Sequence, residues 1–100
     1  MENRNRVLLI PDAYKGNQSG AIVTQIGKKL LLENGNVVSI FSSDIDQDSV
    51  DDDGTKLFHR TPYNGLSNWR ENRYIEEFDK VLAESNATVL FTLGSITNKN

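Results

Sequence analysis

The sequence predicts an α/β fold, because short apolar runs and amphipathic helical segments alternate along its 100 residues. Three runs consist almost entirely of apolar residues: RVLLI (6–10), NVVSIF (36–41) and ATVLFTLG (87–94). Such runs are typical of strands that are buried on both faces of a parallel sheet. The segments 19–35 and 72–86 carry apolar residues at helical spacing. A strand, a helix and a second strand within about 35 residues form a βαβ unit, whose two strands are parallel.

The first strand is expected to end at Pro11, since proline has no amide hydrogen for a strand ladder. The helix 19–35 repeats large apolar residues at four-residue intervals, which predicts that one face of it packs on the core. The residues of this face are Ile22, Val23, Ile26 and Leu30. Ser19 or Asn17 is expected to cap the start of the helix, and Gly35 to end it in the left-handed region.

Six aspartates lie between residues 42 and 56, after the second strand. This stretch is predicted to be a solvated loop, because little in it can pack. It does not match a calcium loop, since Ser49 and Thr55 stand where an EF-hand starting at Asp44 needs glycine and glutamate. A D-x-D triplet at 44–46 or 46–48 is compatible with a divalent cation, but such triplets are frequent by chance here. No metal site is expected.

The rest of the chain predicts a third strand at 56–63, the helix 72–86 and a fourth strand at 87–94. On that helix Tyr74, Phe78 and Leu82 share one face, flanked by Ile75 and Val81. The expected strand order is 3-2-1-4, in a Rossmann-like three-layer domain with a mostly parallel sheet of about four strands. Both faces of such a sheet need helices, and the chain supplies only two good ones. Residues 1–100 are therefore expected to be one domain that is a fragment or one half of a larger architecture.

The composition excludes several classes of protein. The formal net charge of -3 argues against a general nucleic-acid binder, which normally has a basic face. No stretch reaches the roughly 18 apolar residues of a membrane span, and the N-terminus lacks the apolar core of a secretory signal. The absence of cysteine suits a reducing compartment. We therefore expect a cytoplasmic protein without a membrane span and without a nucleic-acid partner.

The loop PDAYKGNQSG, residues 11–20, is the first candidate binding site. It follows the carboxyl end of the first strand, where parallel sheets bind ligands, and leads into a helix N-terminus, whose amides favour anions. It is not a P-loop, because Lys15 stands before the glycines. The alternative is an ordinary turn without a ligand. His59, the only histidine, is a candidate base or substrate ligand, or else a partly buried structural residue.

The stretch VLLIPDAYKGNQSGAIVTQIGKKLLLENGNVVSIFSSD resembles the opening of two-domain glycosyltransferases of the GT-B fold, especially family-4-like enzymes. Their first helix follows a G-x-x-V-x-x-L-x-x-L-x-x-x-G rhythm. The residues that roughly follow it here are Gly20, Val23, Ile26, Leu30 and Gly35. The segment FDKVLAESNATVLFTLGSI, residues 78–96, resembles the part in which a helix ends and a strand leads to the cleft.

This resemblance implies an acceptor-side domain of an enzyme that moves a sugar from a nucleotide-sugar donor to an acceptor. The donor-phosphate loop facing the cleft would contain Lys15, Gly16, Asn17, Ser19 and Gly20. The substrate-binding residues would include Asp12, His59, Arg60, Gly94 and Ser95. A donor-binding C-terminal domain would be the main partner, the acceptor would be a small molecule or glycan, and no cofactor would be bound covalently. Catalysis by this chain alone is not expected, since Leu93 and Gly94 stand where a cleft histidine belongs.

Two other functions stay open. PDAYKGNQSG is also similar to the PDSFKGSLSA opening of bacterial glycerate kinases, and DDDGT (51–55) faintly resembles their DGGEGT. In that case Asp12 and Lys15 would lie in the substrate and phosphate region. Alternatively, the chain is a stand-alone α/β binding module. If the chain is instead a fragment of a larger enzyme, its exposed cleft face would allow it to form a homodimer.

Overall fold

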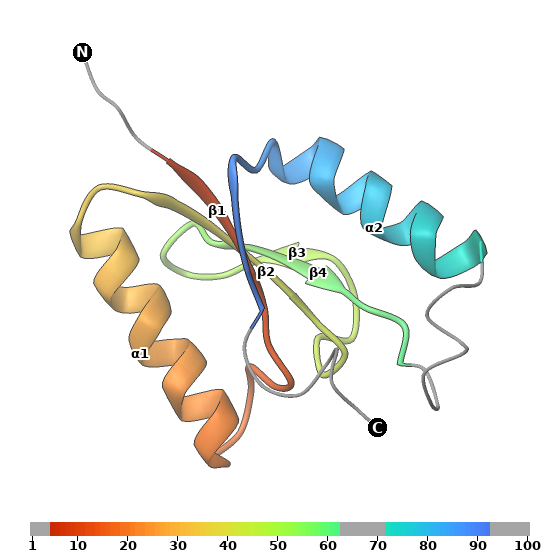
Figure 1. Ribbon diagram of the computed structural model, residues 1–100. Helices are drawn as coiled ribbons and strands as arrows, with labels where there is room; N and C mark the ends of the chain where they lie inside the picture. Colours follow the sequence, from red (N-terminus) through yellow and green to blue (C-terminus); the bar gives the residue numbers. More distant parts are fainter. Residues whose placement is uncertain (1–4, 63–71, 93–100) are drawn as a thin grey trace.

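The computed structural model describes residues 5–62 and 72–92, and it shows an α/β fold with a five-stranded mixed sheet and two helices (Figure 1). The elements in chain order are β1 (Arg6–Ile10), α1 (Ser19–Glu33), β2 (Val37–Ser42), β3 (Ser49–Val50), β4 (Lys56–His59), α2 (Asn72–Ser85) and β5 (Val89–Thr92). Gly35 has a φ of 86° after α1, as predicted for the residue that ends this helix.

The sheet has the order β3-β4-β2-β1-β5. The strand β1 is parallel to both β2 and β5, and β2 is parallel to β4. The complete order differs from the predicted 3-2-1-4 because the sheet has one more strand. This strand, β3, pairs antiparallel with β4 at the outer edge. A short hairpin in the aspartate-rich stretch therefore extends the sheet where the sequence predicted a loop.

The helices lie on opposite faces of the sheet, and each covers its own apolar core (Figure 1). Side chains alternate between the faces along each strand. On the α1 face Val7, Leu9 and Ile40 are buried, with Leu31 and Leu32 of the helix packed against them. On the α2 face the core includes Leu8, Ile10, Phe41, Phe58 and Val81, with Phe78 and Leu82 beside it. The prediction that β1 is buried on both faces and ends before Pro11 is confirmed.

The predicted core face of α1 is wrong. The four residues of that face are about half exposed: Ile22 43%, Val23 56%, Ile26 55% and Leu30 54%. The helix instead buries Ala21 and Thr24 against the sheet. Polar contacts fix this rotation, since Gln25 donates to the carbonyl of Tyr14 and Lys28 reaches the β3–β4 turn. Small residues bring the helix close to the sheet, and the large aliphatic side chains of the predicted face point away from it, whereas Leu31 and Leu32 pack on the core.

The aspartate-rich stretch is also more ordered than predicted. Ile45 is 1% exposed and belongs to the α1-face core. The Asp51 amide donates a hydrogen bond to the Thr55 carbonyl at 2.8 Å, which closes the turn between β3 and β4. Gly54 in this turn has a φ of 88°, a conformation that glycine adopts readily. One buried isoleucine and a tight turn thus hold a segment that is otherwise strongly acidic. This order places several of its carboxylates at fixed positions.

Candidate functional site

The carboxyl ends of β1, β2 and β4 meet at one edge of the sheet, because these strands are parallel. The β1–α1 loop, residues 11–18, leaves β1 at this edge. Asp44 follows β2, and its side chain binds the backbone of the β1–α1 loop. Its carboxylate accepts hydrogen bonds from the amides of Tyr14 and Lys15, at 2.9 and 2.8 Å, and from the Ser42 hydroxyl at 2.6 Å. The sequence does not single out Asp44, because the aspartate-rich stretch has the composition of a solvated loop.

The charge on Asp44 is stabilised by these contacts. Burial by itself would raise the pKa of Asp44, but the hydrogen bonds from Ser42 and from the two loop amides outweigh it and lower the pKa below its ordinary value. Asp44 is therefore ionised at neutral pH. A fixed carboxylate that binds two successive amides sets the course of the loop before any ligand arrives.

The residues predicted to bind a donor phosphate lie together after this anchor. Residues 15–20 are all exposed, and Gly16 has a φ of 94°, which side chains rarely allow. Gln18 is the N-cap residue of α1 and makes no side-chain capping bond, so the prediction that Ser19 or Asn17 caps the helix is wrong. The first turn of α1 also contains no acidic residue. The N-terminus of α1 therefore has neither a side-chain cap nor an acidic side chain of its own first turn.

Arg60 and His59 lie at the same edge, at the end of β4. Arg60 donates through Nη2 to the carbonyl of Pro11 at 2.9 Å, which connects β4 to the start of the β1–α1 loop. Nδ1 of His59 lies 2.6 Å from the carbonyl of Ile45. Because a carbonyl only accepts, Nδ1 is the donor of this contact. Asp12, which directly follows Pro11, is exposed, whereas Gly94 and Ser95 lie outside the described residues.

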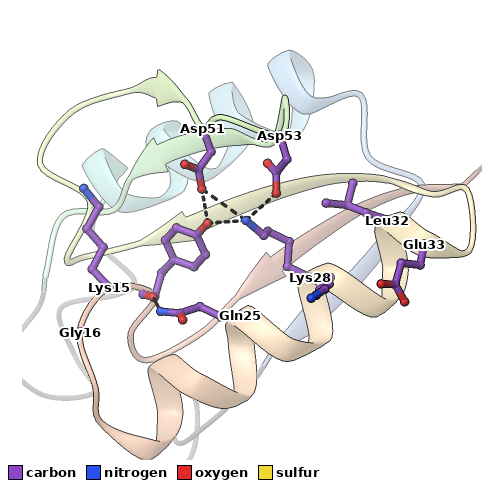
Figure 2. A pocket seen from close by; sticks show the side chains of 10 residues that line it. Lys15, Gly16, Gln25, Lys28, Leu32, Glu33, Asp51 and Asp53 are labelled. Carbon is purple, nitrogen blue, oxygen red and sulfur yellow. Dashed lines mark hydrogen bonds and ion pairs between the residues drawn. The ribbon is translucent and has the colours of Figure 1, made fainter.

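A hollow of about 820 Å³ opens next to the loop, between α1 and the β3–β4 turn (Figure 2). Tyr14, Lys15 and Gly16 line it from the β1–α1 loop. Its charged lining residues are three lysines and three carboxylates, namely Lys15, Lys28, Lys29, Glu33, Asp51 and Asp53. These formal charges cancel, so the hollow has no net attraction for an ion of either sign.

Tyr14 and Lys28 form the centre of a polar cluster in this hollow (Figure 2). The ammonium of Lys28 donates to the Tyr14 hydroxyl at 2.8 Å and lies 3.3 Å from Asp51 and 2.8 Å from Asp53. The Tyr14 hydroxyl in turn donates to Asp51. Lys28 also stands 5.3 Å from the centre of the Tyr14 ring. The cluster connects the loop, the helix and the hairpin turn.

The electrostatics of the cluster keep each group in its ordinary charge state. Burial, followed by the hydrogen bond to Asp51, raises the pKa of Tyr14. Desolvation opposes the charge on Lys28, but its bonds to Asp53 and Tyr14 win and raise its pKa. The bond from Lys28 lowers the pKa of Asp53 to about 2. A lysine with all three donors engaged is a poor nucleophile or base, so the cluster is better suited to hold the hollow in shape.

The stability of the protein is expected to fall in acid as Asp53 loses its charge. The folded pKa of about 2 lies below the ordinary value of 3.8, so this contribution is complete above pH 3.8 and is lost as the pH falls through 2. For a buried group the shift corresponds to roughly 2 kcal/mol. The Asp53 side chain is 38% exposed, so screening reduces the expected contribution to about 1 kcal/mol.

Urea unfolding of the wild type and of Asp53→Asn at a series of acidic pH values measures this contribution. The difference in free energy of unfolding between the two proteins should shrink as the pH falls through this window. A difference that stays constant down to pH 2 would show that the Lys28–Asp53 ion pair contributes nothing that depends on the charge of Asp53.

Within residues 5–62 and 72–92, no three His, Cys, Asp or Glu side chains are grouped so that they could hold a metal ion. In the same part of the chain, no helix is long and apolar enough to cross a lipid bilayer. Comparisons of the chain with protein-family models, with curated proteins and with solved structures find no match.

Proposed function

We propose that the chain is the Rossmann-like, acceptor-side domain of a glycosyltransferase that moves a sugar from a nucleotide-sugar donor to a hydroxyl-bearing acceptor. The main support for this proposal is that the exposed loop residues Lys15 and Gly16 also line the neighbouring hollow. An anion at the loop and an uncharged polar molecule in the hollow would thus be neighbours. These are the two chemical classes that such a transfer brings together.

The donor side of the proposal rests on the loop. Exposed backbone amides, a glycine with positive φ and the ammonium of Lys15 suit the phosphates of a nucleotide-sugar. Because Asp44 fixes the amides of Tyr14 and Lys15, the loop reaches this shape without a ligand and loses little conformational entropy on binding. Arg60 supports the same loop through the carbonyl of Pro11.

The acceptor side rests on the hollow. Cancelling charges disfavour an ionic ligand, whereas carboxylates, lysines and the amide of Gln25 can hydrogen-bond hydroxyl groups. A hollow of about 820 Å³ lies within the size range of small-molecule sites. A second domain would close over this edge and supply the rest of the donor site.

Amide NMR titrations test this proposal directly. UDP-glucose and GDP-mannose, added separately, should shift the amide signals of residues 12–20 with dissociation constants of about 1 mM, as for half of a site. Lys15→Ala should weaken this binding about fivefold. Lys80→Ala is the matched control, because Lys80 is a 58% exposed lysine that pairs with Asp48 away from the loop. The proposal fails if neither nucleotide-sugar shifts the loop signals, or if both variants weaken binding equally.

A phosphotransferase acting on a 2-hydroxy acid is the second candidate function. It is favoured by the positions of Asp12 and Lys15, which are both exposed on the β1–α1 loop. The same titration with D-glycerate separates the two functions. Shifts in the loop with glycerate but not with nucleotide-sugars would support the kinase and exclude the glycosyltransferase.

A further inference from the structure

The outer face of α1 is an apolar surface that the fold leaves uncovered. Ile22, Val23, Ile26 and Leu30 are between 43% and 56% exposed. At about 100° per residue they lie on the side of the helix opposite Ala21 and Thr24, which are fully buried against the sheet. These four residues are called the α1 stripe below. Large aliphatic side chains grouped on the outside of a helix mark an interaction surface.

The spacing of the α1 stripe is that of a helix that pairs with another helix. Val23, Ile26 and Leu30 follow each other at intervals of three and four residues, like the a and d positions of a heptad. Ile22 and Lys29 flank this seam on one side, and Gly20 and Gly27 flank it on the other. The stripe extends over two turns of helix, about 12 Å.

Gly27 is independent support for a partner at the α1 stripe. A glycine inside a helix costs about 1 kcal/mol relative to alanine, and a Cβ atom at Gly27 would meet nothing within 4 Å. The same space is open at Gly20. The fold of one chain therefore gives no steric reason for these glycines. A partner helix that approaches closely along this side would give one.

The ends of α1 supply a charge argument for the identity of the partner. Its N-terminus has no acidic residue in the first turn and no side-chain cap, so its positive dipole end is uncompensated. Its last residue is Glu33, and its last turn contains no basic residue. An antiparallel second copy would place its own Glu33 next to this N-terminus. One helix thus has both halves of a self-complementary pair.

We propose that two copies of this chain form a dimer in which their α1 helices pack antiparallel across a two-fold axis at Ile26. In this register Ile26 faces Ile26 of the second copy, and Ile22 faces Leu30. Ser19 faces Glu33 of the second copy, whose carboxylate lies at the uncapped N-terminus of α1. The dimer does not require the glycosyltransferase function, because the α1 stripe faces away from the sheet. Glu33 of the second copy and a donor phosphate would, however, compete for the same helix N-terminus.

Sedimentation equilibrium and substitution of the central residue test the dimer. The wild type should sediment at twice the 11.2 kDa mass of one chain. Ile26→Glu should weaken association about 100-fold or more, because it buries two like charges at the axis. Ile75→Glu is the matched control, since Ile75 is a 46% exposed isoleucine on α2 and should leave the dimer intact. A wild type that stays monomeric at roughly 100 μM would overturn the proposal, as would equal dissociation by both variants.

Gly27→Ala separates packing from folding. The variant should raise the melting temperature of the monomer through its better helix propensity, and it should weaken association at least tenfold by holding the helices apart. Unchanged association would exclude a close helix pair along this side of α1.

The chain has no cysteine, so single thiols test the orientation. Ile26→Cys should form a disulfide between copies under mild oxidation, whereas Ser19→Cys should not. Crosslinking through position 19 would indicate parallel helices and overturn the antiparallel pairing.

Discussion

Asp44→Ala is expected to lower the free energy of unfolding by about 3 kcal/mol, the largest effect of any polar substitution at the sheet edge. The variant removes a carboxylate that binds the amides of Tyr14 and Lys15 and the hydroxyl of Ser42. Hydrogen bonds to a charged group contribute about 1.5–3 kcal/mol each to stability. In the variant, both amides lose this partner and must hydrogen-bond to water instead. Urea unfolding at neutral pH measures the loss.

Asp46→Ala is the control for this prediction. Asp46 lies two residues away in the same acidic stretch and is exposed, so its replacement should change stability by less than about 0.5 kcal/mol. In Asp44→Ala, the amides of Tyr14 and Lys15 should also exchange with solvent faster than in the wild type. Equal stability of the two variants would show that the charge of the stretch matters, rather than the contacts of Asp44.

The second large effect is expected from Lys28→Met, which should cost about 2–3 kcal/mol. Methionine keeps most of the length of the side chain but removes the ammonium that Tyr14, Asp51 and Asp53 share. The two carboxylates would then repel each other beside an apolar group. Removing one partner of a partly buried ion pair is costly because the remaining charge is left without compensation. The Lys28 side chain is 12% exposed, so water replaces little of the lost interaction.

Lys29→Met controls for the change of charge and of helix propensity. Lys29 is the next residue of α1 and is exposed, so we expect a change of less than about 0.5 kcal/mol. Thermal and urea unfolding of both variants at neutral pH give the comparison. If Lys29→Met is destabilised as much as Lys28→Met, then the net charge of the helix, rather than the cluster around Tyr14, accounts for the effect.

The sequence predicted the strands well because burial on both faces leaves a direct trace. Each residue of RVLLI except the first is buried, and Pro11 has no donor for a ladder, so the start and the end of β1 could be read from residue types. The alternation of strands and helices likewise predicted β2, β4 and β5 as parallel strands beside or near β1. The two-residue strand β3 could not be found in this way, because Ser49 and Val50 carry no periodicity.

The rotation of α1 could not be predicted from its sequence. Hydrophobic spacing favours the α1 stripe as the buried face, but that face is exposed in the structure. What fixes the helix are contacts with distant residues: Gln25 with the carbonyl of Tyr14, and Lys28 with the β3–β4 turn. No local pattern reveals such partners. The open space beside Gly27 is consistent with a stripe that is covered by another molecule.

The candidate site divides in the same way. The loop at 11–20 could be placed at the carboxyl edge from the fold class alone, whereas the contact of Arg60 with the carbonyl of Pro11 could not be predicted. The roles of Asp44, Asp51 and Asp53 could not be predicted, because six closely spaced aspartates cannot be told apart by their sequence context. Which of them are held depends on where Tyr14 and Lys28 stand in three dimensions.

The position of β5 next to β1 determines when the protein can finish folding. Val7 pairs with Val89, and Arg6 donates to the Thr88 hydroxyl across 82 residues of chain. Closing so long a loop is slow, and the contact cannot form during synthesis until nearly all described residues have left the ribosome. One edge of the central strand β1 therefore stays open while β2 and β4 assemble on the other. Until β5 has been synthesised, the nascent chain exposes an apolar strand edge, which is the feature of a folding intermediate that chaperones protect.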